Sequence, residues 1–147
     1  MKPITETLIQ TLPAPIEKVF AALTDPARIP RWLPGCTAVQ ASAPLHRGGL
    51  LRVWFGPDRE VTFVIVDYKA PYTFGWVEKN GRVGAKTFFR LDVANGATAV
   101  TVKEQWQPNG LMAWLRRKWY NKRRQGMKLD KAIEGLRTSV SMEAMGA

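Results

Sequence analysis

The stretch from Cys36 to Trp106 restricts the fold more than any other part of the chain. Apolar and polar residues alternate along it, most clearly from Val83 to Val93, as expected of a sheet covered on one face and wet on the other. Turn-forming residues recur at the intervals of an antiparallel meander: Gly48-Gly49, Gly56-Pro57-Asp58, Ala70-Pro71, Asn80-Gly81 and Asn95-Gly96. The stretch therefore predicts about six antiparallel strands.

The residues before this stretch predict one further strand and two short helices. The segment from Ile4 to Thr11 is rich in threonine and isoleucine and stops before two prolines, which is typical of a strand. Apolar residues at helical spacing then predict a helix from Ile16 to Leu23. A second helix is expected to start at Pro26, with Asp25 as its cap, and to end at Pro34-Gly35.

A long helical pattern closes the chain and runs to about Val140. Its apolar stripe consists of Leu115, Trp119, Lys122, Gly126, Leu129, Ile133, Leu136 and Val140. Four basic residues lie on the opposite side: Arg117, Arg124, Lys128 and Lys131. Because the sheet has one apolar face and the helix one apolar stripe, we expect the two to pack together. The space between them is the natural place for a ligand.

Two segments near the start resemble a known family. The run from Ala14 to Pro26 (APIEKVFAALTDP) and the run from Trp32 to Cys36 (WLPGC) are similar to the opening of SRPBCC proteins. This is the START-related, polyketide cyclase/dehydrase-like superfamily that includes the birch-pollen-allergen proteins. Gly49, Thr98 and the closing helix also fit its pattern, so the resemblance covers about residues 4–140.

The resemblance implies one domain over residues 1–147 with an α+β helix-grip fold. In that fold a curved antiparallel sheet of about seven strands wraps around a long C-terminal helix, and two short helices follow the first strand. It also implies a hydrophobic cavity between sheet and helix that holds a lipid, a polyketide, a sterol or another apolar molecule. No catalytic residue is implied, because the superfamily has no universal catalytic motif.

Composition excludes several kinds of site. A single cysteine, Cys36, excludes an internal disulfide, and a single histidine, His46, excludes clustered-histidine metal sites. A catalytic pair of these two is not expected, because His46 precedes a predicted turn and Cys36 begins a predicted strand. No cofactor is expected, since Arg47-Gly48-Gly49 matches no phosphate loop. The start MKPITETLIQ lacks the apolar run of a signal peptide, so we expect a cytoplasmic protein.

Ten residues are candidates for lining the cavity. The aromatic candidates of the sheet are Trp54, Phe63, Tyr72, Phe74, Trp76 and Phe89, and the others are Glu104, Trp119, Lys122 and Gly126.

Lys122 and Gly126 interrupt the apolar stripe of the helix. Gly126 is expected to make room in the cavity, and Lys122 to meet an anionic or carbonyl group of the ligand. The alternative is a Lys122 that reaches along the helix to water.

The sheet contributes two candidate carboxylates. Glu104 shares a face with Val102, and Glu78 shares one with Trp76. Either carboxylate could pair with Lys122 or act as a general acid or base if its face points inward. The alternative is that both lie at the rim.

The charge of the chain is concentrated near its end. The net charge is +10, and residues 111–131 hold eight basic residues and one acidic residue. This segment suits transient contact with an anionic membrane, or it forms a solvated helix face. Nucleic-acid binding is disfavoured because Trp119 falls on the apolar stripe. Oligomeric state does not follow from the pattern.

Three functions are therefore compatible with the sequence. The first is binding of a small hydrophobic or amphipathic molecule. The second is a cyclase or dehydratase that uses Glu104, Glu78 or Tyr72 as a proton relay. The third is a module whose basic helix docks on a membrane, a ribosome or an acidic protein.

Overall fold

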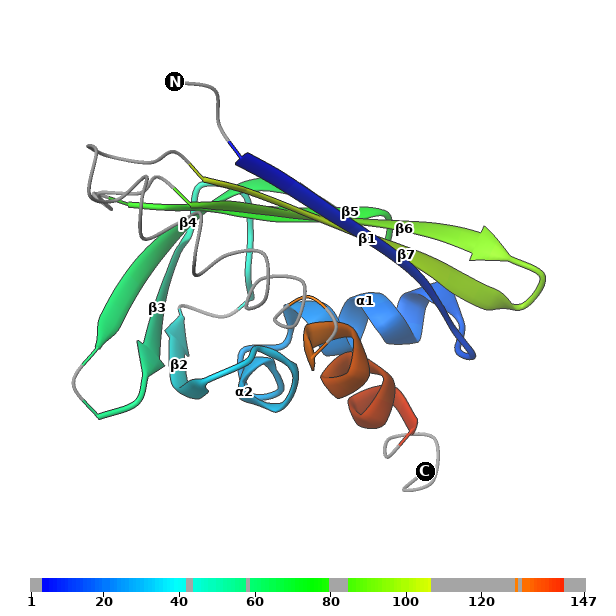
Figure 1. Cartoon of the computed structure of the whole chain (residues 1–147), viewed down its shortest axis with the longest axis horizontal. Helices are drawn as coiled ribbons and strands as arrows, with labels where there is room; N and C mark the ends of the chain where they lie inside the picture. The colour runs from blue at the N-terminus through cyan, green and yellow to red at the C-terminus, as the bar shows by residue number, and fades with distance from the viewer. Residues whose placement is uncertain are drawn as a thin grey trace.

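A seven-stranded antiparallel sheet forms the frame of the molecule (Figure 1), seen in a computed structural model that describes residues 4–41, 44–57, 59–79, 85–106, 129 and 131–141. The strands are β1 (Ile4–Leu12), β2 (Cys36–Ala41), β3 (Leu50–Phe55), β4 (Glu60–Lys69), β5 (Thr73–Glu78), β6 (Lys86–Ala94) and β7 (Ala97–Trp106). Their order is β1-β7-β6-β5-β4-β3-β2, with β1 beside the last strand. The predicted meander and helix-grip architecture are confirmed.

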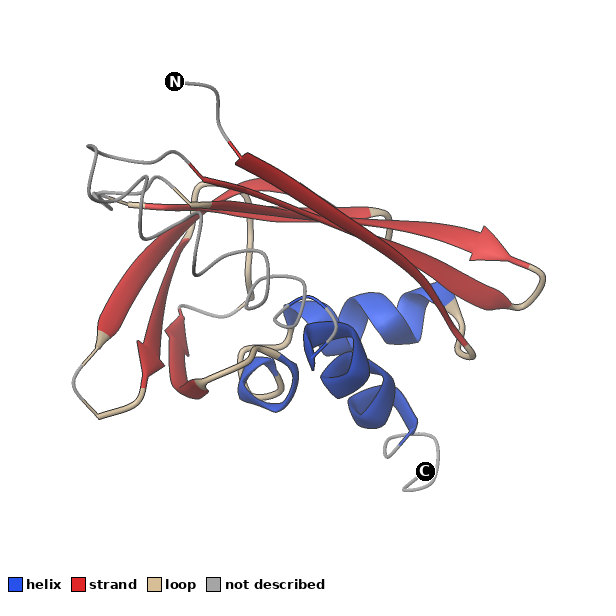
Figure 2. Ribbon diagram, in the orientation of Figure 1, coloured by secondary structure: helices blue, strands red, loops and turns tan. Residues whose placement is uncertain are grey.

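The sheet is strongly curved, and the helices lie on its concave side (Figure 2). Register shifts interrupt the ladder between Cys36 and Ala38 and between Ile65 and Asp67. Such bulges bend the strand that carries them and increase its twist. In Figure 1, β2, β3 and the adjoining end of β4 turn away from β5, β6 and β7, and the helices lie in the space so enclosed.

Two short helices follow β1: α1 (Ile16–Thr24) and α2 (Ile29–Trp32). The prediction that the second helix starts at Pro26 is wrong by three residues. Asp25 is not its N-cap either, since Arg28 holds that position; the Asp25 carboxylate instead accepts a hydrogen bond from the Ala27 amide at 3.0 Å in the turn before the helix. The chain forms a turn there, closed by the Arg28 amide donating to the Asp25 carbonyl, before regular helix begins.

The C-terminal helix is described at residue 129 and over residues 131–141. The stripe residues in this part are buried: Leu129, Ile133, Leu136 and Val140. Lys131 is exposed, as its place opposite the stripe predicts. The predictions for Trp119, Lys122 and Gly126 concern positions outside the described residues. No helix among the described residues is long and apolar enough to span a membrane.

Gly135 brings the C-terminal helix into contact with α2. A Cβ atom at this position would lie 2.7 Å from Trp32 Cα and 2.8 Å from the Arg31 carbonyl oxygen. These are backbone atoms, so they cannot rotate away as the end of a flexible side chain would. Close packing of the two helices therefore requires glycine at position 135.

We expect Gly135→Ala to destabilise the fold by about 1–3 kcal/mol, the usual cost of overpacking. The sign is diagnostic, because the same change inside an exposed helix stabilises by about 1 kcal/mol. Denaturant unfolding measures the effect, with Lys131→Ala as the control at an exposed site of the same helix. A Gly135→Ala protein as stable as the wild type would contradict the packing described here.

Candidate ligand-binding site

A cluster of aromatic side chains lies between the concave face of the sheet and α2. Trp32 of α2 stacks on Trp76 of β5, with ring centroids 6.0 Å apart and planes 13° from parallel. It also meets Phe89 of β6 edge-on at 5.4 Å, and Phe63 of β4 packs on Trp76 at 5.1 Å. The Trp32 indole N–H donates to the Ala22 carbonyl at 3.2 Å, which satisfies its only polar group.

A cavity of about 140 Å³ opens beside this cluster. Its walls come from the sheet, from α2 and the residues after it, and from the C-terminal helix. The lining residues are Trp32, Leu33, Pro34, Phe55, Arg59, Val61, Phe63, Trp76, Glu78, Ala85, Thr87, Phe89, Val102, Glu104, Leu129 and Ala132. Most of this surface is apolar and aromatic, so the cavity suits an apolar group of a ligand.

The polar lining consists of Glu78, Thr87, Glu104 and Arg59. In the ladder, Thr87 of β6 lies opposite Glu104 of β7 on one side and opposite Trp76 on the other. Glu78 follows Trp76 by two residues and therefore faces the same way. These polar residues lie toward the turns that follow β3 and β5, and we call this part of the cavity the mouth.

Glu6 of β1 stands next to the mouth and was not among the predicted site residues. It lies directly opposite Glu104 in the β1–β7 ladder. Its Oε2 atom is buried and has no hydrogen-bond partner among the described residues, and burial raises the pKa of its carboxyl. In the sequence, Glu6 alternates in phase with the apolar residues Ile4 and Leu8, which indicates that it lies on the apolar side of the strand. Only the pairing of β1 with β7 shows that Glu6 lies opposite Glu104.

The structure places several predicted residues at the cavity. Phe63, Trp76, Phe89 and Glu104 line it, as does Glu78. Phe74 is fully buried and supports the lining from behind, with its ring 5.5 Å from that of Trp76 in an edge-on contact.

Tyr72 and Trp54 do not line the cavity, so these two expectations are wrong. Tyr72 precedes β5 in a turn closed by its own amide donating to the Lys69 carbonyl, and its side chain is 57% exposed. Trp54 follows buried Val53 in β3 and therefore lies on the outer face of the sheet. There the Arg52 guanidinium lies 5.2 Å from its ring.

Cys36 and His46 do not form a catalytic pair. Cys36 begins β2 and is half-buried, which raises the pKa of its thiol above the ordinary value. His46 lies beyond the other end of β2 and is exposed, with its Nδ1 3.2 Å from the Pro44 carbonyl oxygen. A raised thiol pKa also opposes the thiolate that a nucleophile needs.

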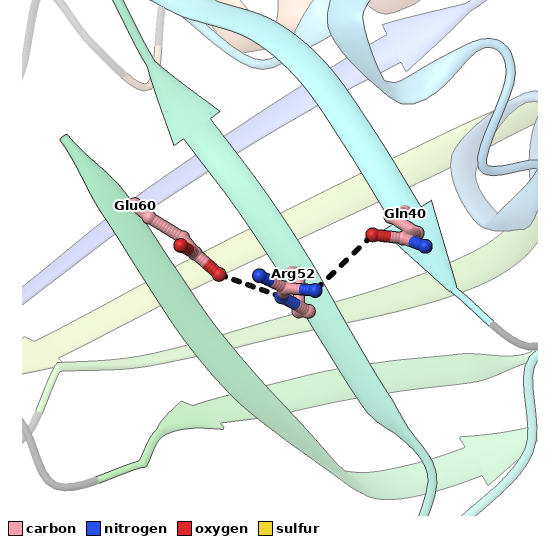
Figure 3. Close-up of polar contacts among 3 residues, drawn as sticks. All are labelled: Gln40, Arg52 and Glu60. Carbon is pink, nitrogen blue, oxygen red and sulfur yellow. Dashed lines mark hydrogen bonds and ion pairs between the residues drawn. The ribbon is translucent and has the colours of Figure 1, made fainter. Parts of the chain in front are cut away.

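A wider, shallower hollow of about 690 Å³ lies mainly over the outer face of β2, β3 and β4. Its centre is the Arg52 side chain, which donates to Glu60 Oε1 at 2.6 Å and to Gln40 Oε1 at 3.3 Å (Figure 3). The carboxylate raises the pKa of the guanidinium. Because Arg52 already has partners in the neighbouring strands, this hollow is a weaker candidate than the aromatic cavity.

The raised pKa of Glu6 makes stability depend on pH in a defined direction. The folded protein holds this proton more tightly than the unfolded chain, so the cost of ionising Glu6 appears as pH rises through the window between its unfolded and folded pKa. We expect Glu6→Gln to match the wild type below this window and to be more stable above it.

Melting temperatures measured from about pH 3 to pH 8 would check this, since the lower limit lies below the ordinary glutamate pKa of about 4.3. Glu17→Gln is the control, because Glu17 is exposed on α1. A Glu6→Gln variant whose advantage does not grow with pH would contradict the assignment.

Comparisons with known proteins agree with this architecture. Residues 4–141 match the family described as polyketide cyclase / dehydrase and lipid transport. Protein NE0264 from Nitrosomonas europaea superposes with a TM-score of 0.79 at 15% identity, over 97% of both chains. Ara h 8.0201 does so with 0.71 at 15% identity, over 99% of this chain and 100% of the other.

A third similar structure is the di-domain ARO/CYC protein StfQ from the steffimycin biosynthetic pathway. It superposes with a TM-score of 0.77 at 8% identity, over 97% of this chain and 52% of that chain. No curated protein was found to match. At such low identities the three structures establish the fold and carry no information about the ligand.

Proposed function

Because the chain belongs to the polyketide cyclase/dehydrase and lipid transport family, and with it to the SRPBCC superfamily, we propose that it binds a small hydrophobic or amphipathic molecule in the cavity between sheet and C-terminal helix. The observation that carries this proposal is the aromatic wall formed by Trp32, Trp76 and Phe89. The family match over residues 4–141 also supports treating the chain as a single domain.

Apolar burial supplies the binding energy in this proposal. Each Å² of apolar surface removed from water contributes about 25 cal/mol, so a ligand that buries about 200 Å² gains about 5 kcal/mol before the cost of immobilisation. The rigid lining helps, because Trp32 is already held by α1, β5 and β6 and loses little freedom when a ligand binds.

Ala132→Phe tests the proposal, because Ala132 lies in the lining on the C-terminal helix and is 6% exposed. The added ring should fill much of the 140 Å³ and weaken saturable binding of an environment-sensitive apolar dye at least tenfold. Fluorescence titration measures this, and circular dichroism confirms that the variant folds.

Lys131→Phe is the matched control. It adds the same ring to the same helix at an exposed position, so it should leave dye binding within about twofold of the wild type. Equal dye binding by a folded Ala132→Phe protein would contradict a ligand site at this cavity.

Cyclase or dehydratase chemistry is the second candidate, and the Glu6–Glu104 pair favours it. The two carboxylates lie opposite one another, Glu104 lines the cavity, and burial raises the pKa of Glu6. A carboxyl with a raised pKa keeps its proton to a higher pH than an ordinary glutamate, which suits donation to a substrate carbonyl, and a neighbouring carboxylate is able to accept a proton. In this candidate the cavity would orient the chain of the substrate and exclude water.

Docking on a membrane or a ribosome remains the third candidate. It rests on the basic residues from 116 to 131, of which the described residues include only Lys131, which is exposed. The exposure of Lys131 is what the described residues add to the charge pattern of the sequence.

A further inference from the structure

The two edges of the sheet differ in how well they are protected against pairing with another chain. At one edge, β2 has six residues and a register shift between Cys36 and Ala38. At the other edge, β1 has nine residues in continuous register with β7, and none of them is proline, lysine or arginine (Figure 1). Bulges, shortness, proline and lysine are the usual protection of an edge strand. Among the described residues no strand lies on the other side of β1, so its backbone donors and acceptors there form a long row suited to pairing.

The side chains of β1 also suit pairing with another strand. The exposed residues of its outer face are Thr5, Thr7, Ile9 and Thr11. All four are β-branched and uncharged, and such residues pair favourably across strands. The one charged residue of β1 is Glu6, which lies on the inner face with Leu8, a residue that packs against the core.

Two buried polar atoms near this edge have no hydrogen-bond partner among the described residues: Glu6 Oε2 and Arg137 Nε. Arg137 reaches β1 from the C-terminal helix, and its Nη2 donates to Gln10 Oε1 at 3.3 Å. Glu6 and Gln10 are four residues apart in one strand, a distance of about 13 Å. The carboxylate and the guanidinium therefore do not meet within one protomer. Because both atoms are already buried, a contact between them would add a hydrogen bond at little further cost of desolvation.

Antiparallel pairing of β1 with β1 of a second copy brings these two groups together. A two-fold axis through Leu8, perpendicular to the sheet, pairs all nine residues of the strand and keeps the inner faces of both copies on one side. Glu6 then lies opposite the partner's Gln10, with the two Cβ atoms about 4.5–5.5 Å apart. At that distance the Glu6 carboxylate reaches the guanidinium that is bound to this glutamine, that of the partner's Arg137.

The match is specific to this register. An axis at Thr7 or at Ile9, the nearest alternatives that keep each face intact, shortens the pairing by two residues and places Glu6 opposite a leucine. A charge on the inner face of an edge strand ordinarily opposes pairing. Only the axis at Leu8 places that charge opposite Gln10 and the arginine bound to it.

We propose that this chain forms a two-fold symmetric dimer in which the β1 strands of two copies pair antiparallel about Leu8 and join the two sheets into one. Each interface then holds two contacts between Glu6 and the partner's Arg137, because a two-fold interface repeats every contact. The inference is independent of the ligand, since it uses only the edge of the sheet and the end of the C-terminal helix.

The positive charge of the chain permits this dimer. The net charge is +10, but the nearest described lysine on the outer face is Lys103 of β7, opposite Thr7. In the dimer three strand spacings, about 14 Å, separate the two copies of Lys103. Exposed charges at that separation are largely screened, since the screening length is roughly 8 Å at physiological salt.

The contact with Arg137 also affects Glu6. A guanidinium beside the carboxyl would lower its pKa. The pH profile expected for Glu6→Gln therefore applies to dilute protein, in which the protomers are separate.

Ile9→Lys tests the dimer without disturbing the core, because Ile9 is 65% exposed. The two lysines would be diagonal neighbours across the axis, about 7–8 Å apart, and would repel each other. Analytical ultracentrifugation over a wide range of protein concentration should show a dimer for the wild type. The variant should have a dissociation constant at least tenfold higher. Val93→Lys is the matched control: Val93 is 68% exposed but lies on β6, two strands from the edge, so the constant should stay within about twofold.

A charge exchange tests the register. Glu6→Arg and Arg137→Glu each place like charges across the interface, so each should weaken the dimer at least tenfold. The combined variant restores opposite charges and should return the dissociation constant to within about threefold of the wild type. Because the two positions do not meet within one protomer, this recovery requires contact between copies. Circular dichroism confirms that each variant folds, and Ile9→Lys decides the matter should a variant at a buried position fail to fold.

A wild-type protein with the mass of one protomer at every concentration overturns the proposal. A dimer that Ile9→Lys leaves as stable as the wild type overturns it too, because the copies would then meet at another surface. Folded single variants whose combination does not restore the dimer refute the pairing about Leu8, and with it the proposal. None of these outcomes bears on dye binding, so the ligand proposal is tested separately.

Discussion

The position of Trp32 is the constraint on which the rest of the structure depends. Its ring lies against Trp76 and Phe89 of the sheet, and its indole N–H is fixed to the Ala22 carbonyl of α1. Its backbone is covered by Gly135 of the C-terminal helix so closely that no side chain fits between them. Trp32 thus sets the spacing between the sheet, the two short helices and the C-terminal helix. Because α2 has only four residues, this packing rather than its own hydrogen bonds must hold it in place.

The cavity follows from this arrangement. The helix approaches α2 at Gly135 and is tied to β1 by Arg137, whose Nη2 donates to Gln10 Oε1 at 3.3 Å. The bulges in β2 and β4 bend this end of the sheet around the helices. Near Phe63 and Ala132 the two layers separate and leave about 140 Å³. Carboxylates occur where that space reaches the strand ends, because side chains at that end retain access to water.

Local periodicity predicted most of the fold and only part of the site. Alternation put Trp76 and Phe89 on the apolar faces of their strands, and both line the cavity, because a strand interior keeps its period of two. Tyr72 has the same parity as Trp76, but it lies in the turn before β5, where parity no longer determines direction. Features that depend on a distant partner were not predictable. Glu6 lies opposite Glu104 only because β1 pairs with β7, and position 135 requires glycine only because the backbone of α2 packs against it. Nothing in the neighbouring sequence of either residue specifies that partner.

The net charge of the chain and the charged residues of the cavity lining act on a ligand over different ranges. At about 0.15 M salt, exposed charges are screened over roughly 8 Å, so the net charge of +10 influences the approach of a ligand more than its final orientation. Inside the cavity the apolar walls of Trp32 and Phe63 limit this screening. A polar substituent inside the cavity would therefore respond to the charges of the lining more than to the distant charges of the surface. In the proposed function the aromatic walls supply the affinity, because they hold most of the apolar surface that a ligand would bury.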